Sequence, residues 1–127
     1  FGEQTVLKDA YTVTYGAGTA NKFSADQGYS EHQLGTTIDF TTSKLGSSIS
    51  NFNKTKEYEW LLKNAHEHGF ILSYSDNNPS YIFEPWHWRF VGIELAKRLY
   101  EEKQEFYTLQ QRQIDPYLLN LFESMVE

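Results

Sequence analysis

Apolar residues recur at helical spacing in four stretches of this chain. In residues 1–15 the pattern predicts the end of a helix, which nearby glycines then stop. A second helix is expected from a cap at Asn53 or Thr55 to about His68, with Gly69 just after its end. The residues expected on the buried face of this helix are Tyr58, Leu61, Leu62 and Ala65.

Two more helices are predicted towards the C-terminus. The first begins after Val91, and its apolar positions are Ile93, Leu95, Ala96, Leu99 and Tyr100. The second is expected to start with Asp115 as its cap and Pro116 as its first residue, because the fixed φ of proline suits a first helical turn. Its expected buried positions are Leu118, Leu119 and Phe122.

Short runs of β-branched and aromatic residues predict strands between these helices. Residues 36–41 predict a strand with Ile38 and Asp39 on opposite faces. Further strands are expected at 70–74 and at 81–83, the latter leading into a tryptophan-rich segment.

Small polar segments connect the predicted elements. Residues 43–53 are rich in serine and glycine and predict a loop, and residues 76–79 predict a turn. There are no internal repeats. We therefore expect an α+β fold with a small, mainly antiparallel sheet flanked by helices, in a single domain over residues 1–127.

Composition restricts the class of partner more than the fold. The net charge is −6 and no Lys/Arg cluster occurs, which argues against a nucleic-acid or anionic-membrane partner. Cysteine is absent, so neither a disulfide nor a thiolate metal site can form. The first residue is Phe1 and the only methionine is Met125, so any export signal or membrane anchor is expected to lie outside this chain.

Two polar clusters carry the candidate chemistry. His32 and Asp39 lie seven residues apart, and the segment Glu84-Pro85-Trp86-His87-Trp88-Arg89 follows much later. Together they supply two histidines, an aspartate and a spare glutamate, the set that a hydrolytic zinc site uses for three ligands and a general base. On a continuous strand, residues seven apart point to opposite faces. His32 and Asp39 can therefore share a metal only if the chain turns between them, which Gly35 allows.

Each of these residues also has a commoner structural role. A histidine in a turn usually lies at the surface, and an aspartate at a strand end is usually a turn former. Within the second cluster, His87 and Arg89 are expected on one strand face, with Trp86 and Trp88 packing on the other. Spacing alone therefore leaves both the zinc site and a purely structural role open.

The two clusters together carry a family resemblance. Ser30-x-His32-x-x-Gly35-x-x-x-Asp39, followed by Glu84-x-x-His87-Trp88, resembles the signature of the VanY-type D-alanyl-D-alanine carboxypeptidases. These zinc peptidases are grouped with lysostaphin-like enzymes and the Hedgehog signalling domain. The resemblance implies Zn²⁺ as cofactor, with His32, Asp39 and His87 as ligands, Glu84 as catalytic base and Ser30 as a supporting residue.

The beginning of the chain departs from the family pattern. Members carry a Tyr-Arg-Ser motif followed by a glutamine, and the arginine is associated with the substrate carboxylate. Gln4 matches that glutamine, so the arginine would fall just before Phe1, and the chain is expected to lack the N-terminal part of the family domain. Arg89 is the nearest substitute cation, although a structural role on the sheet is the simpler expectation for it. Trp86 is a further candidate supporting residue.

The resemblance implies a bacterial enzyme that works outside the cytoplasmic membrane. Its substrate would be a peptidoglycan stem peptide, from which it would remove the C-terminal D-alanine. An L,D-carboxypeptidase or an endopeptidase would share every catalytic residue and stays open, as does a non-catalytic zinc module that binds cell wall. An Fe(II) oxygenase site is disfavoured, because the gap of seven between His32 and Asp39 and the extra Glu84 do not suit it.

Overall fold

The computed structural model describes residues 30–123, with side chains of the last helix described only to residue 118. The helix expected within residues 1–15, and Gln4 with it, lie outside these residues. The described elements are the 3₁₀ helix η1 (Glu31–Leu34), β1 (Thr37–Asp39), η2 (Ile49–Lys54), α3 (Lys56–Asn64), η3 (Ala65–His68), β2 (Phe70–Leu72), β3 (His87–Phe90), α4 (Ile93–Glu102), η4 (Phe106–Thr108) and α5 (Gln111–Glu123). None of the helices in this part of the chain combines the length and the apolar character needed to cross a bilayer.

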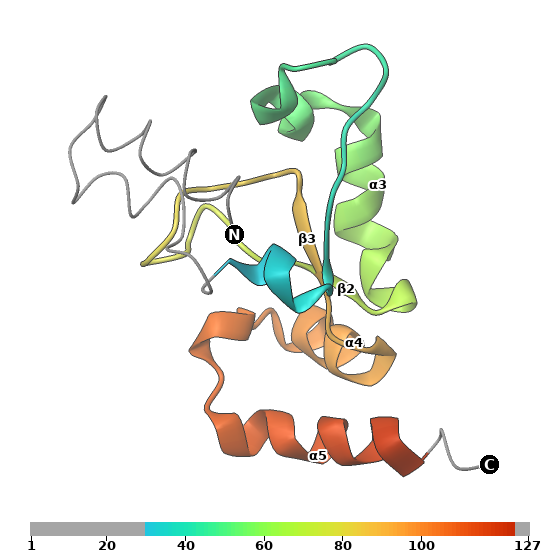
Figure 1. Ribbon diagram of the computed structural model, residues 1–127, viewed down its shortest axis with the longest axis vertical. Helices are drawn as coiled ribbons and strands as arrows, with labels where there is room; N and C mark the ends of the chain where they lie inside the picture. Colours follow the sequence, from blue (N-terminus) through green and yellow to red (C-terminus); the bar gives the residue numbers. More distant parts are fainter. Residues whose placement is uncertain (1–29, 124–127) are drawn as a thin grey trace.

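The sheet is small and antiparallel, as expected for the α+β class. Its three strands lie in the order β1-β3-β2, so the last strand in sequence is the central one. Figure 1 shows α3 and α4 beside the strands and α5 beyond α4, at the end of the molecule away from η2. Across β1 and β3, Asp39 lies opposite His87 and Ile38 lies opposite Trp88.

The strand expected at residues 81–83 does not form, so that prediction was wrong. The side-chain oxygen of Asn78 accepts the backbone N–H groups of Ser80 and Tyr81, at 2.9 and 3.0 Å. Just after the segment, the N–H of Glu84 donates to the Tyr74 carbonyl at 3.0 Å. The Tyr81 N–H is therefore used by the turn at Asn78 and not by a strand ladder.

The helix predicted after Thr55 is present. The Thr55 hydroxyl accepts the N–H of Tyr58 at 3.1 Å, which confirms it as the cap. The α-helix α3 continues as the 3₁₀ helix η3, and Gly69 ends it with a φ of 83°. Ala65 is buried, but Leu62 is 44% exposed, so its predicted burial was wrong. Since successive residues are about 100° apart around a helix, Leu62 cannot share the inward direction of its neighbour Leu61.

The interior also draws on a segment that was predicted as loop. Within residues 43–53, η2 begins at Ile49 and places Phe52 in the core, where its ring packs edge-on against Tyr58. A single phenylalanine among polar residues gives no periodic signal, so the sequence did not reveal this turn. The helix α4 forms as predicted. Among the described residues, the buried core includes Phe52, Ala65, Tyr74, Trp88, Leu95, Ala96 and Leu99.

The last helix begins earlier than predicted. It starts at Gln111, and Pro116 lies inside it rather than at its first position. The side chain of Gln113 accepts the N–H of Gln110 at 2.8 Å and so caps the helix ahead of Asp115. The predicted burial of Leu118 was also wrong, since it is 42% exposed. The side chains of the other two predicted buried positions, residues 119 and 122, lie outside the described residues.

Candidate metal centre

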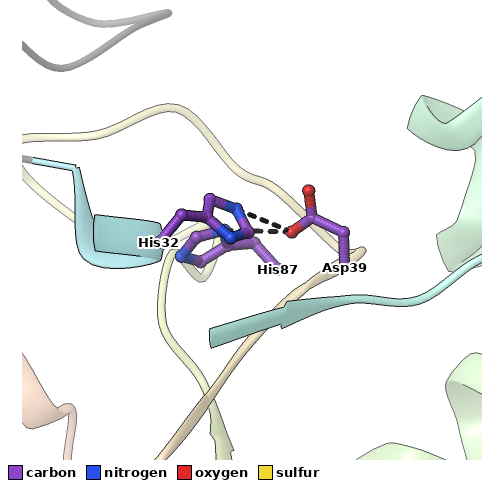
Figure 2. Close-up of side chains that lie close together, drawn as sticks. All are labelled: His32, Asp39 and His87. Carbon is purple, nitrogen blue, oxygen red and sulfur yellow. Dashed lines mark hydrogen bonds and ion pairs between the residues drawn. The ribbon is translucent and has the colours of Figure 1, made fainter. Parts of the chain in front are cut away.

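Three side chains from separate elements converge at one end of the sheet. His32 comes from η1, Asp39 from the end of β1 and His87 from the start of β3 (Figure 2). Their nearest nitrogen and oxygen atoms all lie within 4.8 Å of one another. Asp39 Oδ1 is 3.2 Å from His32 Nε2 and 3.2 Å from His87 Nδ1. The side chains of His32 and Asp39 are exposed, whereas that of His87 is buried.

A glycine turn brings His32 to the same side as Asp39. Gly35 follows η1 with a φ of 69°, and its N–H donates to the His32 carbonyl at 3.2 Å. This left-handed conformation favours glycine. The turn that the sequence required between the two side chains is therefore present.

The pairing of β1 with β3 sets the position of Asp39 relative to His87. The register places these two residues opposite each other, and the N–H of Phe40 donates to the Trp86 carbonyl at 2.9 Å just beyond them. His87 and Arg89 lie on the same strand face, as predicted, because both side chains reach the carboxylate of Glu31. Trp86 lies in the turn just before β3, so it is not a residue of that strand as predicted.

A tight turn holds Glu84 beside His87. The His87 N–H donates to the Glu84 carbonyl at 3.0 Å, with Pro85 at the second position of the turn, which suits its fixed φ. The buried indole of Trp88 donates its Nε1–H back to the Pro85 carbonyl at 2.9 Å. As a result, Glu84 Oε2 lies 3.7 Å from His87 Nδ1, on the same side of the ring as Asp39.

Glu31 belongs to this site and was missed from the sequence. Its carboxylate is only 5% exposed and contacts His87 Nε2 at 2.9 Å and Arg89 Nη1 at 2.8 Å. The hydroxyl of Tyr107 donates to the same carboxylate. A glutamate in a short polar turn normally faces solvent, and its partners lie 56 to 76 positions later in the chain, so no local pattern could reveal it.

The buried charges shift the pKa values of the site in opposite directions. Burial raises the pKa of Glu31, but hydrogen bonds from His87 and Tyr107 and the charge of Arg89 outweigh it and bring that pKa to about 2. Burial lowers the pKa of His87, but hydrogen bonds to Asp39 and Glu31 and the charge of Glu84 raise it to about 9.

For Glu84, in contrast to Glu31, burial outweighs the opposing effects on the pKa. Burial raises its pKa to about 7, with Asp39 and Glu31 adding to the rise and the charge of His87 opposing it. A carboxyl group with a pKa near neutrality can both accept and release a proton at physiological pH.

Aromatic rings form one wall beside His87. The ring of Tyr74 stacks on the imidazole with centroids 4.6 Å apart, and Tyr81 stacks on the other side of Tyr74 at 4.6 Å. Tyr107 lies 5.8 Å from Tyr81 and completes the group. Tyr74 and Tyr81 come from irregular segments and Tyr107 from the short helix η4, and the sequence analysis did not place any of them at the site.

The remaining predicted residues lie around this centre. The carbonyl of Ser30 accepts the N–H of Gln33 at 3.1 Å at the start of η1. Arg89 pairs with Glu31, and its guanidinium carbon lies 4.6 Å from the centroid of the Phe106 ring. Through these two contacts, Arg89 connects the sheet to η1 and η4.

The converging atoms fit a zinc ion. Ligand distances of about 2.0–2.2 Å in tetrahedral geometry separate neighbouring ligand atoms by about 3.3 Å. The two 3.2 Å separations around Asp39 Oδ1 agree with that spacing. Two imidazoles and one carboxylate are also the donor types that catalytic zinc sites use with a fourth position open. The residues present can therefore hold Zn²⁺.

Comparisons with known proteins agree with this geometry. A family model described as VanY, D-alanyl-D-alanine carboxypeptidase, matches residues 1–93. The chain is 34% identical over 95 residues to the D-alanyl-D-alanine carboxypeptidase of Enterococcus faecalis, a match that covers 72% of this chain and 34% of that protein. The chain spans between 27% and 37% of the length of the first three curated relatives that it matches.

Solved structures similar to the chain include enzymes of both specificities. One is the LdcB LD-carboxypeptidase, with a TM-score of 0.71 and 28% identity over 92% of this chain and 53% of that one. The other is the vancomycin resistance D,D-pentapeptidase VanY of the VanB-type cassette, solved in complex with Zn(II). Its TM-score is 0.68 at 28% identity, covering 91% of this chain and 64% of that one.

Proposed function

The chain belongs to the VanY D-alanyl-D-alanine carboxypeptidase family, a family of zinc-dependent peptidases, and on that premise we propose that it cleaves the C-terminal D-alanine from peptidoglycan stem peptides. The proposed zinc ligands are His32 Nε2, Asp39 Oδ1 and His87 Nδ1. Its action would lie outside the cytoplasmic membrane, where peptidoglycan is found.

One observation carries the proposal. Glu84 Oε2 lies 3.7 Å from His87 Nδ1, the same atom that lies 3.2 Å from Asp39 Oδ1. A carboxylate outside the ligand set is therefore next to the point where the three ligand atoms converge. A structural zinc site has four closed protein ligands and needs no such base, whereas a hydrolytic site needs one.

The protein groups divide the work of hydrolysis. Zinc, when bound, lowers the pKa of the attacking water and polarises the scissile carbonyl. Glu84 accepts the proton of that water as the new C–O bond forms, and it returns a proton to the amine of the departing D-alanine as the C–N bond breaks.

The same site fits a second specificity. LdcB is an LD-carboxypeptidase and VanY a D,D-pentapeptidase, yet the chain is 28% identical to each. We propose D,D-cleavage because the matching family model is that of D-alanyl-D-alanine carboxypeptidases. L,D-cleavage is the second candidate, favoured by the TM-score of 0.71 with LdcB.

A direct competition between substrates tests this proposal. The zinc-loaded chain is incubated with stem pentapeptide and stem tetrapeptide together, and the products are identified by mass spectrometry. Loss of one alanine from the pentapeptide alone is the expected result. Loss from the tetrapeptide would replace the D,D-assignment with L,D-cleavage. Cleavage of neither peptide, with one zinc bound per chain, would contradict catalysis by this chain and favour a binding module.

A further inference from the structure

The two histidines of the proposed zinc site present different ring nitrogens. His32 faces Asp39 with Nε2, whereas His87 faces it with Nδ1. An imidazole can offer a lone pair at only one nitrogen while the other carries a hydrogen, so the choice depends on what the second nitrogen contacts. For His87 that contact is Glu31, whose Oε2 lies 2.9 Å from Nε2.

The two oxygens of Glu31 have separate partners. Oε1 accepts hydrogen bonds from Arg89 Nη1, at 2.8 Å, and from the Tyr107 hydroxyl. Oε2 faces His87 Nε2. A glutamate that served only to pair with Arg89 would not need its second oxygen aligned with an imidazole. One oxygen thus anchors the carboxylate, and the other is held against the ring.

The ring of His87 is also confined on its faces and edge. Tyr74 stacks on it with an interplanar angle of 14°, and the His32 ring meets it at 87° with centroids 4.7 Å apart. These two neighbouring rings restrict rotation of the His87 ring about its Cβ–Cγ bond. The ring contacts restrict the orientation of His87, and the contact with Glu31 bears on its tautomer.

We propose that Glu31 is a positioning residue for the metal centre, because it accepts the Nε2–H of His87 and so directs the Nδ1 lone pair of that ring towards the zinc ion. The proposal rests on the proposed zinc peptidase function. Glu31 does not touch the metal, and it acts only through His87.

Replacement of Glu31 by Gln gives a sharp test. Arg89 has only donors and Tyr107 donates its hydroxyl hydrogen, so the amide oxygen is expected to face them. The amide N–H would then point at His87 Nε2 and favour the tautomer with hydrogen on Nδ1, which blocks the metal-facing nitrogen. The expected loss of zinc affinity is about 10–100-fold, measured by competition with a chromogenic chelator.

The tautomer itself can be observed. The chain has four histidines, so long-range ¹H–¹⁵N spectra of the imidazoles can be assigned individually. In the zinc-loaded wild type, we expect hydrogen on Nε2 of His87 and zinc on Nδ1. In the folded Glu31→Gln variant we expect the reverse tautomer, with hydrogen on Nδ1, in the zinc-free protein at a pH where the imidazole is neutral. A metal bound to His87 through Nε2 in the wild type would overturn the proposal.

Two further variants separate positioning from folding. Glu102→Gln removes an exposed glutamate that pairs with Arg98 at 3.1 Å on α4, and it should leave zinc affinity unchanged. Tyr107→Phe removes one donor to Glu31 while Arg89 remains, and it should keep the His87 tautomer even if Glu31→Gln does not fold. A changed tautomer in Tyr107→Phe would refute the division of roles between the two oxygens.

Failure of this proposal differs from failure of the proposed function. A wild-type chain that binds no zinc would contradict the zinc peptidase itself. A wild-type chain that binds zinc, with a folded Glu31→Gln variant of equal affinity and the same His87 tautomer, would contradict only the role of Glu31.

Discussion

Replacing Glu84 by Gln should abolish turnover while leaving both the fold and the zinc site in place. The main-chain bonds of this residue do not involve its carboxylate: its N–H donates to Tyr74 and its carbonyl accepts from His87, both at 3.0 Å. Glutamine has nearly the same shape, so the turn should persist. The change removes only the group that can accept a proton.

The expected loss in rate follows from the role of Glu84 as a general base. Such groups contribute about 10²–10⁴-fold in rate, which corresponds to about 2.7–5.5 kcal/mol in activation free energy. Glu84 is expected at the upper end, because its oxygen lies 3.7 Å from His87 Nδ1, whereas the neighbouring carboxylates of Asp39 and Glu31 are already in direct contact with His87 at 3.2 and 2.9 Å. Since Glu84 is not a proposed ligand, zinc should stay at one per chain.

The assay measures alanine release from stem pentapeptide by the zinc-loaded wild type and the Glu84→Gln variant, together with zinc content and thermal unfolding. Glu57→Gln, an exposed glutamate in the first turn of α3, is the matched control and should keep full activity. If Glu84→Gln retained wild-type kcat, the assignment of the base would be wrong. If it lost its zinc, Glu84 would have to be counted among the ligands.

Three other substitutions test the site and its frame. His87→Ala should release the metal, whereas the control His66→Ala should retain it. If elemental analysis found the zinc content unchanged in both variants, the proposed ligand set would be contradicted. Gly69→Ala should destabilise the chain more than Gly35→Ala in urea unfolding. Both glycines have a positive φ, so an alanine at either position costs about 1–2 kcal/mol of stability. At Gly69 the added Cβ would also lie 3.1 Å from backbone atoms, whereas at Gly35 it would meet open space. Equal losses of unfolding free energy in the two variants would refute this reasoning. Trp88→Phe should lower the free energy of unfolding by about 2–4 kcal/mol. It leaves the buried Pro85 carbonyl without its donor and places a smaller ring in the core. A shift in thermal midpoint smaller than that of Gly35→Ala would contradict this value.

The sequence predicted the parts of this structure that depend on neighbouring residues. The cap at Thr55 and the left-handed glycines at 35 and 69 are set within a few positions, and the structure contains all of them. The family resemblance carried by the two motifs is confirmed by the match over residues 1–93. The motifs also pointed to the side chains that converge, although their roles as ligands and base stay predictions.

Other features depend on distant partners or on competing local bonds. Glu31 becomes a buried anion only because His87, Arg89 and Tyr107 surround it after folding. Segment 81–83 looked like a strand, but its first backbone donor, the N–H of Tyr81, bonds to the side chain of Asn78. In both cases the deciding contact is not visible in the periodicity of apolar residues.

The central position of β3 links assembly of the site to the order of folding. Among the described strands, β1 and β2 each pair with β3 and not with each other, so neither can be paired until the latest strand arrives. Asp39 and His87 are 48 residues apart, and closing a loop of that length costs about 3 kcal/mol in chain entropy. A zinc ion that bridges β1 and β3 would bind only after this closure, so its binding free energy would add directly to the stability of the closed chain. The metal would then act as a cross-link that locks a non-local strand pairing as well as a cofactor.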